Sequence, residues 1–146
     1  MELIDIIPNS MSFRIVSTMD VPEGTATPEG FTGRVRRYVG SRLASIGWYH
    51  DGVLQNPSRQ HPAFRQFRES GRVKYELWCS EGSLQDPAYD MPAVRGFYAD
   101  GTLHYEERWT LGRRQDGADG APAIRKWRAD GSLRHERSYR AGGRVA

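Results

Sequence analysis

The chain has 146 residues, of which 38% are hydrophobic and 27% charged, and its formal net charge is +3 at pH 7. This length fits one domain, and the low apolar content is typical of a thin, extended sheet rather than of a compact two-layer fold. No run of eighteen apolar residues occurs and the start, MELIDIIPNS, lacks the basic and long apolar regions of a secretory signal. We therefore expect neither a transmembrane helix nor a signal peptide. The single cysteine, Cys79, excludes an internal disulfide framework, is expected in the core and favours the reducing cytoplasm.

Residues 1–31 are predicted to form an N-terminal β cap and a linker. Glu2–Ile7 and Met11–Thr18 have the composition of short strands, and Pro8-Asn9 predicts the turn between them. Asp20–Gly30, which contains Pro-Glu-Gly twice, predicts an exposed linker. A cap is the expected role because a stack of hairpins must cover its terminal apolar face.

From residue 32 onward the sequence repeats with a period of thirty residues and without an insertion. The matching positions are Arg65, Arg95 and Arg125; Phe67, Phe97 and Trp127; Gly71, Gly101 and Gly131; Glu76, Glu106 and Glu136; and Cys79, Trp109 and Tyr139. These matches predict a repeat protein. Its four units would be residues 32–61, 62–91, 92–121 and 122–146. The first unit matches the others at fewer positions, and the last is shorter.

Each unit carries two turn signals. The first signals are Ser70-Gly71, Asp100-Gly101 and Asp130-Gly131. They lie between runs rich in aromatic and β-branched residues, which is a strong hairpin pattern. The second signals are Gly82, Gly112 and Gly142, each ahead of a longer polar segment. Because no stretch has the 3.6-residue apolar period of a helix, we predict an all-β chain, an antiparallel meander of β-hairpin repeats that forms one extended sheet.

Two hairpin registers are open. A two-residue turn would place Arg95 opposite Glu106, whereas a type I turn with Gly101 as a bulge would place Phe97 opposite Leu103. We favour the bulge because it gathers the apolar positions on one face. That face would hold Ala93, Phe97, Leu103, Tyr105 and Trp109, and then Ala123, Trp127, Leu133, His135 and Tyr139. Strand alternation would place the three glutamates at 76, 106 and 136 on the opposite face.

The glycine-bounded hairpins resemble a known family. The segments that carry the resemblance are Phe97–Leu103 (FYADGTL), continued through Glu106 to Trp109–Gly112 (WTLG), and Lys126–Gly142 (KWRADGSLRHERSYRAG). They resemble the MORN-repeat variant of bacterial antitoxin-like proteins. Arg113–Ala123 is also similar to a His-Arg-x-Asp-Gly-Pro-Ala repeat of bacterial and phage proteins, with Arg-Gln in place of His-Arg and three residues more before Pro122-Ala123. The resemblance covers residues 32–146. It implies an elongated antiparallel sheet with a scaffolding or binding role, such as an antitoxin, immunity or host-factor-binding protein, and no catalytic residue.

No motif for catalysis or metal binding is present. The acidic segment Asp116–Gly120 lacks the spacing and the closing Glu of an EF-hand, so a structural turn is expected. The histidines, which have no metal-ligand spacing, are His50, His61, His104 and His135. Glu106 and Glu107 are adjacent, so on a strand they would point to opposite faces and would not act as a catalytic pair. We predict no enzymatic activity, no metal and no cofactor.

The recurring arginines and glutamates are interpreted as structural. Arg65, Arg95 and Arg125 recur in phase with Glu76, Glu106 and Glu136, because each unit must solve the same stacking problem. Cross-strand or diagonal charge contacts of this kind contribute about 0.2–1 kcal/mol each.

Binding residues are expected in the last unit, where residues 122–146 carry a net charge of +5. The candidates are Arg125, Trp127, Arg128, Arg134, Arg137, Tyr139 and Arg140, with Tyr98 and Trp109 from the preceding unit. Because Arg, Trp and Tyr are favoured interface anchors, we predict another protein as the partner. The resemblance implies that this partner is a bacterial host protein or a cognate toxin. The alternatives are binding of nucleic acid or anionic lipid by the same residues, and an inert solvated face. The sequence leaves open which sheet face binds. The bare C-terminal edge also predicts a homodimer, since uncovered sheet edges tend to pair.

Overall fold

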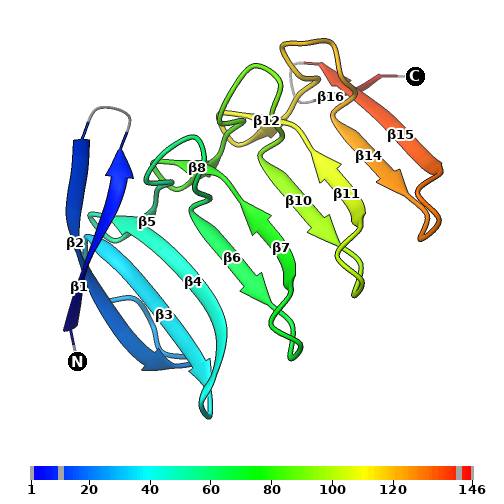
Figure 1. Cartoon of the computed structure of the whole chain (residues 1–146). Helices are drawn as coiled ribbons and strands as arrows, with labels where there is room; N and C mark the ends of the chain where they lie inside the picture. Colours follow the sequence, from blue (N-terminus) through cyan, green and yellow to red (C-terminus); the bar gives the residue numbers. More distant parts are fainter. Residues whose placement is uncertain (1, 10–11, 141–142, 146) are drawn as a thin grey trace.

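The computed structural model describes residues 2–9, 12–140 and 143–145, and over these ranges the chain contains sixteen β-strands and no helix (Figure 1). The strands are β1 (Glu2–Asn9), β2 (Ser12–Pro22), β3 (Gly33–Val39), β4 (Arg42–His50), β5 (Val53–Leu54), β6 (Phe64–Phe67), β7 (Val73–Leu77), β8 (Cys79–Ser80), β9 (Ser83–Leu84), β10 (Val94–Phe97), β11 (Leu103–Glu107), β12 (Trp109–Thr110), β13 (Arg113–Arg114), β14 (Ile124–Trp127), β15 (Leu133–Arg140) and β16 (Gly143–Val145). The prediction of an all-β chain with mostly antiparallel pairing is confirmed. In the described part of the chain, no helix is long and apolar enough to cross a membrane.

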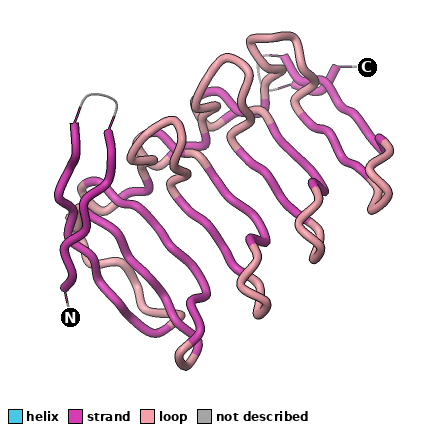
Figure 2. The backbone as a smooth tube through the Cα atoms, in the orientation of Figure 1, coloured by secondary structure: helices cyan, strands magenta, loops and turns pink. Residues whose placement is uncertain are grey.

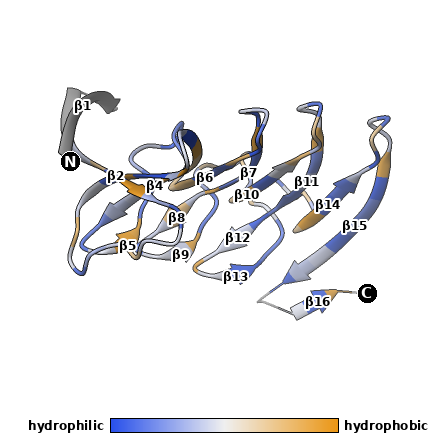
Figure 3. Ribbon diagram, turned by 90° about the horizontal axis from the view of Figure 1, so that it is seen from below, coloured by the Kyte–Doolittle hydropathy of each residue, from blue (hydrophilic) through white to orange (hydrophobic). Residues whose placement is uncertain are grey.

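The hairpins β3–β4, β6–β7, β10–β11 and β14–β15 stand side by side in one twelve-stranded sheet (Figure 1). The strand order is β1-β2-β3-β4-β6-β7-β10-β11-β14-β15-β16, with β5 paired to β4. Tight turns line one edge of the sheet and longer loops line the other (Figure 2). The short pairs β8–β9 and β12–β13 form a second row beside the main hairpins (Figure 3).

Both hairpin pairings that were predicted as alternatives occur in β10–β11. At the turn, Tyr98 N–H donates to the carbonyl of residue 102 and Gly101 has φ of +91°, as expected for a type I turn closed by a glycine bulge. This turn places Phe97 opposite Leu103, as favoured, and the register then shifts by one residue between Gly96 and Phe97. Because of that shift, the arginine and glutamate at 95 and 106 also face each other.

The prediction that all apolar positions share one face is wrong, and the register shift explains why. His104 is an extra residue in β11, so Tyr105 lies opposite Gly96 rather than on the side of Phe97. A Cβ atom added at Gly96 would lie 2.1 Å from the Tyr105 ring, which therefore covers this glycine. Phe97 instead shares a shallow cavity with Glu76. Apolar side chains consequently lie on both faces of the sheet, and the glutamates lie on the face of Phe97. The same shift in β14–β15 separates His135 from Trp127.

Two N-terminal predictions also need correction. Pro8 and Asn9 are paired within β1, opposite Phe13 and Ser12, so the turn does not lie at Pro8-Asn9. β1 is the last strand of the sheet, and an edge strand tolerates proline because no neighbouring strand needs its missing N–H. The predicted linker begins later than expected, because residues 20–22 belong to β2, which runs parallel to β3.

The buried core is thin and depends on alternating large and small residues. Trp78 is 1% exposed, and its backbone N–H donates to the carbonyl of Ala93 at 2.7 Å. Ala63 and Ala93, which lie on the segments that flank Trp78 on either side, are both fully buried. Cys79 is buried as predicted, and burial raises the pKa of its thiol to about 11. This cysteine therefore stays protonated and is not a reactive thiolate at neutral pH.

Candidate functional site

The Arg–Glu series forms a charged row across the sheet. Glu76 on β7 lies in register between Arg65 on β6 and Arg95 on β10. Its carboxylate is 3.0 Å from Arg65 Nη2 and 3.2 Å from Arg95 Nε. The Glu76 side chain is only 8% exposed, so two cations from neighbouring hairpins hold a nearly buried anion between them.

The row continues toward the C-terminus with longer contacts. Glu106 lies opposite both Arg95 and Arg125. Arg125 Nη1 is 3.9 Å from the Glu106 carboxylate, and Arg125 Nε is 3.5 Å from that of Glu136. The charges therefore alternate in register from Arg65 to Glu136.

The charged row ends at an open strand edge. β15 pairs with β14 along one side, whereas on its other side only Ser138–Arg140 pair with β16. Within the described ranges, Glu136 thus has a neighbouring strand on one side only. Its side chain is 41% exposed, five times the exposure of Glu76. On the side away from β14 the carboxylate of Glu136 therefore faces solvent. On the same side, the glutamates at 76 and 106 have a strand that carries an arginine opposite them.

In the earlier hairpins, a side chain near the tip donates a hydrogen bond to a backbone carbonyl of the next hairpin, and this acceptor is absent beside the last hairpin of the described chain. Arg68 Nη2 donates to the carbonyl of Phe97 at 2.9 Å, and the Tyr98 hydroxyl donates to the carbonyl of Trp127 at 2.7 Å. Arg128 holds the corresponding position in the last hairpin and donates to a carbonyl of its own hairpin instead. The edge thus presents two groups, the Glu136 carboxylate and the Arg128 guanidinium, whose counterparts in earlier hairpins contact the next hairpin.

The other arginines predicted to bind do not form one patch. Arg125 belongs to the charged row, whereas Arg137 lies opposite Ile124 on the other face of the sheet. Arg140 is exposed, with its Nε 3.9 Å from a carboxylate oxygen of Asp116. Arg128 and Arg134 are exposed too. The basic charge of the last hairpin is therefore divided between the two faces and the edge.

The predicted aromatic residues are held by contacts within the sheet. The guanidinium of Arg114 lies 5.3 Å from the ring of Trp109 and 5.7 Å from that of Tyr139, within the range of cation–π attraction. Tyr98 stacks on His104 with ring centroids 4.1 Å apart. Trp127, which is half-buried, lies opposite Leu133 next to the tip.

Two loop carboxylates tie consecutive hairpins together, and the sequence analysis missed them. Asp86 Oδ1 accepts hydrogen bonds from the N–H groups of Ala93 and Trp109, both at 2.9 Å. The corresponding bonds to Asp116 come from Ala123 at 3.0 Å and Tyr139 at 2.9 Å. Recurrence of aspartate at a spacing of thirty residues was the signal that could have identified them.

Arg108 is a buried cation that sequence reasoning also missed. It holds the position that corresponds to Trp78, and it is 4% exposed. Trp78 Nε1 donates to the carbonyl of Arg59, and Arg108 Nη1 donates to the carbonyl of Tyr89, thirty residues later. Asp119, whose carboxylate is 3.2 Å from Arg108 Nη2, balances the charge. The acidic loop of residues 116–120, which was expected to be a structural turn, therefore supplies a carboxylate that pairs with a buried arginine.

The two aspartates beside Arg108 have opposite pKa shifts. Burial raises the pKa of Asp86 to about 6, against the hydrogen bond from the Trp109 N–H and the positive charge of Arg108. A hydrogen bond from the Ala121 N–H, helped by Arg108, holds the pKa of Asp119 below its ordinary value. Asp119 is thus the stable anionic partner of Arg108, and Asp86 takes up a proton first on acidification.

No group of three His, Cys, Asp or Glu side chains that could hold a metal ion is found among the residues that the structure describes. Comparisons of the chain with protein-family models, curated proteins and solved structures found no match.

Proposed function

We propose that the chain is a non-enzymatic protein-binding module of MORN-like hairpin repeats, and that its partner adds a strand to the open edge of β15. The observation that carries the proposal is the exposed carboxylate of Glu136 at the end of the charged row. Each earlier glutamate of that row has an arginine opposite it on both neighbouring strands, and Glu136 has one on β14 only.

An open strand edge offers unpaired backbone groups that another chain can bond, as in recognition by β-strand addition. The charge at this edge defines the partner further. A strand that places an arginine opposite Glu136 would repeat the contacts that Glu76 makes with its two arginines. Arg128 would then be close enough to donate to a carbonyl of the added strand, as Arg68 does in an earlier hairpin. The partner that fits is a protein with an accessible arginine-bearing strand, and the resemblance of the hairpins favours a bacterial host protein or a toxin.

The experiment is an affinity capture from bacterial lysate with the tagged full chain, compared between Glu136→Arg and Glu69→Arg. Both variants change the charge equally, but Glu69 lies at an exposed hairpin tip away from the β15 edge. We expect a captured protein that survives nuclease, is retained by Glu69→Arg and is lost with Glu136→Arg. Equal capture by both variants would show that the partner does not bind at the β15 edge. Light scattering of the wild-type chain identifies a second copy as the partner if a dimer forms and Glu136→Arg dissociates it.

The exposed arginines at 128, 134 and 140 favour a second candidate function, binding of nucleic acid or anionic lipid. Neutralisation of phosphates releases counterions, so the affinity would fall steeply between low and physiological salt. In the same capture experiment this function predicts nucleic-acid-binding proteins that disappear after nuclease treatment, and stronger rather than weaker capture by both arginine variants.

A further inference from the structure

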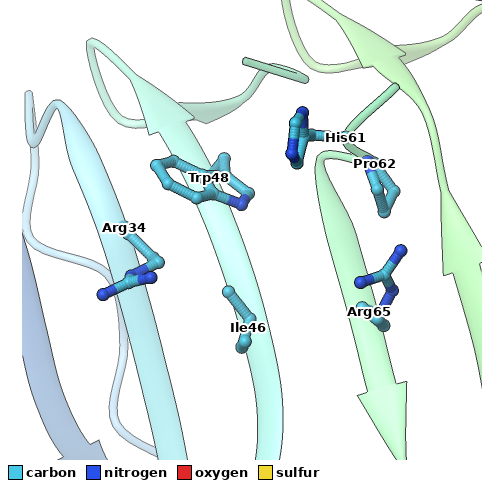
Figure 4. Close-up of a pocket in the computed structure, with 6 residues that line it drawn as sticks. All are labelled: Arg34, Ile46, Trp48, His61, Pro62 and Arg65. Carbon is cyan, nitrogen blue, oxygen red and sulfur yellow. The ribbon is translucent and has the colours of Figure 1, made fainter. Parts of the chain in front are cut away.

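The arginines in the first half of the sheet already have partners within the chain. A cavity of about 180 Å³ beside Trp48 is lined by Arg34 and Arg65, among others, and the close-up shows these two arginines on opposite sides of it (Figure 4). Arg34 Nε donates to the Thr18 hydroxyl at 3.2 Å, and Arg65 Nε donates to the Glu76 carboxylate at 3.1 Å. This cavity therefore offers no free cation to a ligand.

Four basic side chains without an ion-pair partner surround His135 in the last hairpin. Lys126 lies directly opposite His135 on β14, two of the others belong to β15 itself, and the fourth lies on β16. The four are Lys126, Arg134, Arg137 and Arg144, and together with His135 they are called the His135 cluster. Within residues 2–9, 12–140 and 143–145, none of these four side chains forms an ion pair with a carboxylate. The cluster is thus a concentration of uncompensated positive charge.

Strand alternation places the cluster on the face of the sheet opposite the charged row. His135 and Arg137 flank the last glutamate of that row, and neighbouring residues of a strand point to opposite faces. Lys126 lies on the face of His135, because residues directly opposite each other in an antiparallel pair share a face. Arg144 is added to this face by its pairing with Tyr139, two residues beyond Arg137. The glutamates of the charged row therefore do not neutralise the cluster.

The four cations oppose a fifth positive charge at His135. Partial desolvation, and then the charges of Arg137, Lys126, Arg134 and Arg144, lower the pKa of His135 below its ordinary value of 6.5. The charged groups that act on it from β14, from its own strand and from β16 are all cations, so the imidazole is largely neutral at pH 7. An anion bound among them would offset this repulsion and favour the protonated imidazole.

Two tyrosines border the His135 cluster on the same face. Tyr105 lies opposite Lys126 on the neighbouring hairpin, and Tyr139 lies opposite Arg144. Both tyrosines are half-buried, so part of each side chain reaches the surface. This face of the sheet thus combines aromatic rings with basic side chains. Proteins that bind single strands of nucleic acid use the same combination, in which bases stack on the rings and basic groups contact the phosphates.

We infer that the His135 cluster and the two tyrosines beside it bind single-stranded nucleic acid. The basic side chains contact phosphates, the rings of Tyr105 and Tyr139 stack on bases, and His135 adds a further positive charge in acidic solution. A lipid surface would engage the cations but would leave the two rings without a base. The inference rests on the second candidate function, to which it assigns a surface and a ligand, and it does not depend on strand addition at β15.

Fluorescence anisotropy of a fluorescein-labelled oligothymidylate of about twelve nucleotides, titrated with the full chain, tests this inference. At about 50 mM salt we expect a Kd on the order of 10 μM, which rises steeply with salt because bound phosphates release counterions. Replacement of two cluster residues, Lys126→Gln with Arg137→Gln, should weaken binding at least about tenfold. The matched control, Lys74→Gln with Arg59→Gln, removes the same charge from two exposed positions outside the last hairpin and should weaken binding less than about threefold.

The variant His135→Gln isolates the pH dependence of the site. The wild type should bind the oligonucleotide at least about threefold more tightly at about pH 5.5 than at about pH 7.5, since one positive charge is added to the cluster, and His135→Gln should lose this difference.

Two outcomes would overturn the inference and leave the second candidate function standing. Equal weakening by the two double variants would place the nucleic acid elsewhere on the chain, and equal pH dependence of wild type and His135→Gln would show that His135 is not part of the site. Absence of oligonucleotide binding by the wild type would overturn the inference and the proposal of nucleic-acid binding together. Binding of phosphatidylserine vesicles in that case would assign the cations to lipid headgroups.

Discussion

Asp86 Oδ1 accepts a hydrogen bond at 2.9 Å from the backbone N–H of Trp109, a residue of the next hairpin. The same oxygen accepts a second bond from the N–H of Ala93, and the N–H of Asp86 in turn donates to the carbonyl of Trp109. One loop residue thereby joins three backbone groups of the following unit. Asp86 therefore helps to hold the next hairpin in place, and Asp116 makes the corresponding hydrogen bonds one hairpin later.

Replacement of Asp86 should show how much this junction stabilises the fold. Asp86→Ala leaves two inward-facing N–H groups without an acceptor, and we expect unfolding free energy to fall by about 2–4 kcal/mol. Asp86→Asn keeps an oxygen in the same place and matches Asn56, which holds the corresponding position one unit earlier. It should be at least as stable as the wild type at pH 7. Urea denaturation followed by tryptophan fluorescence measures both, and a loss of similar size in Asp86→Asn would contradict the hydrogen-bond explanation.

The raised pKa of Asp86 predicts an unusual pH dependence. Because this pKa is about 6 in the folded chain and 3.8 for an ordinary aspartate, the folded chain binds a proton between those values that the unfolded chain releases. Protonation of Asp86 therefore stabilises the fold at pH 4, and this contribution is lost as the pH rises through about 6. Its upper limit is about 3 kcal/mol, from the value of one pKa unit.

The comparison of wild type with Asp86→Asn isolates this effect from the other titrating groups. We expect the wild type to lose stability relative to Asp86→Asn as the pH is raised from 4 to about 6, and the difference to level off above pH 6. Denaturation curves at several pH values give the difference directly. A constant difference across this range would mean that Asp86 keeps an ordinary pKa in the folded chain.

Much of the fold follows from short-range patterns. Asp100-Gly101 and its counterparts predict tight hairpins, because glycine adopts the left-handed conformation that the bulge requires. The extra residue at His104 could not be predicted in the same way, since nothing in its side chain marks a bulge. That single residue reverses the alternation of β11, which is why the predicted apolar face was wrong for Tyr105.

The candidate sites were predictable only in part. The period of thirty residues identified Glu136 as a member of a series, but its exposure depends on where the series ends in space.

Substitutions of Arg108 can show whether its buried ion pair stabilises the fold as well as the indole at the corresponding position, Trp78, does. Arg108→Ala leaves a cavity and removes the cation that faces Asp86 and Asp119, so we expect a loss of about 3–5 kcal/mol. Arg108→Trp restores the residue type found at Trp78 and should recover most of that loss, since Asp119 is exposed enough to be solvated. Arg113→Ala, at an exposed position, is the control and should change stability by less than about 0.5 kcal/mol. Thermal unfolding measured by circular dichroism ranks the three variants, and equal losses in the Ala and Trp variants would show that the charge itself is required.

Leu111 combines two unfavourable features that one substitution should relieve. Its φ is +49° in a turn completed by Gly112, and its side chain is 80% exposed. Asparagine tolerates the left-handed conformation far better than leucine and is favoured at this position of two-residue hairpin turns. Because the Leu111 N–H that donates to Gln85 is retained, we expect Leu111→Asn to raise unfolding free energy by about 0.5–1 kcal/mol. Leu133→Asn removes a leucine that is 46% exposed from a strand and should not stabilise the chain. Stabilisation by both variants would assign the gain to lost apolar exposure, whereas a gain in Leu111→Asn alone assigns it to relief of backbone strain.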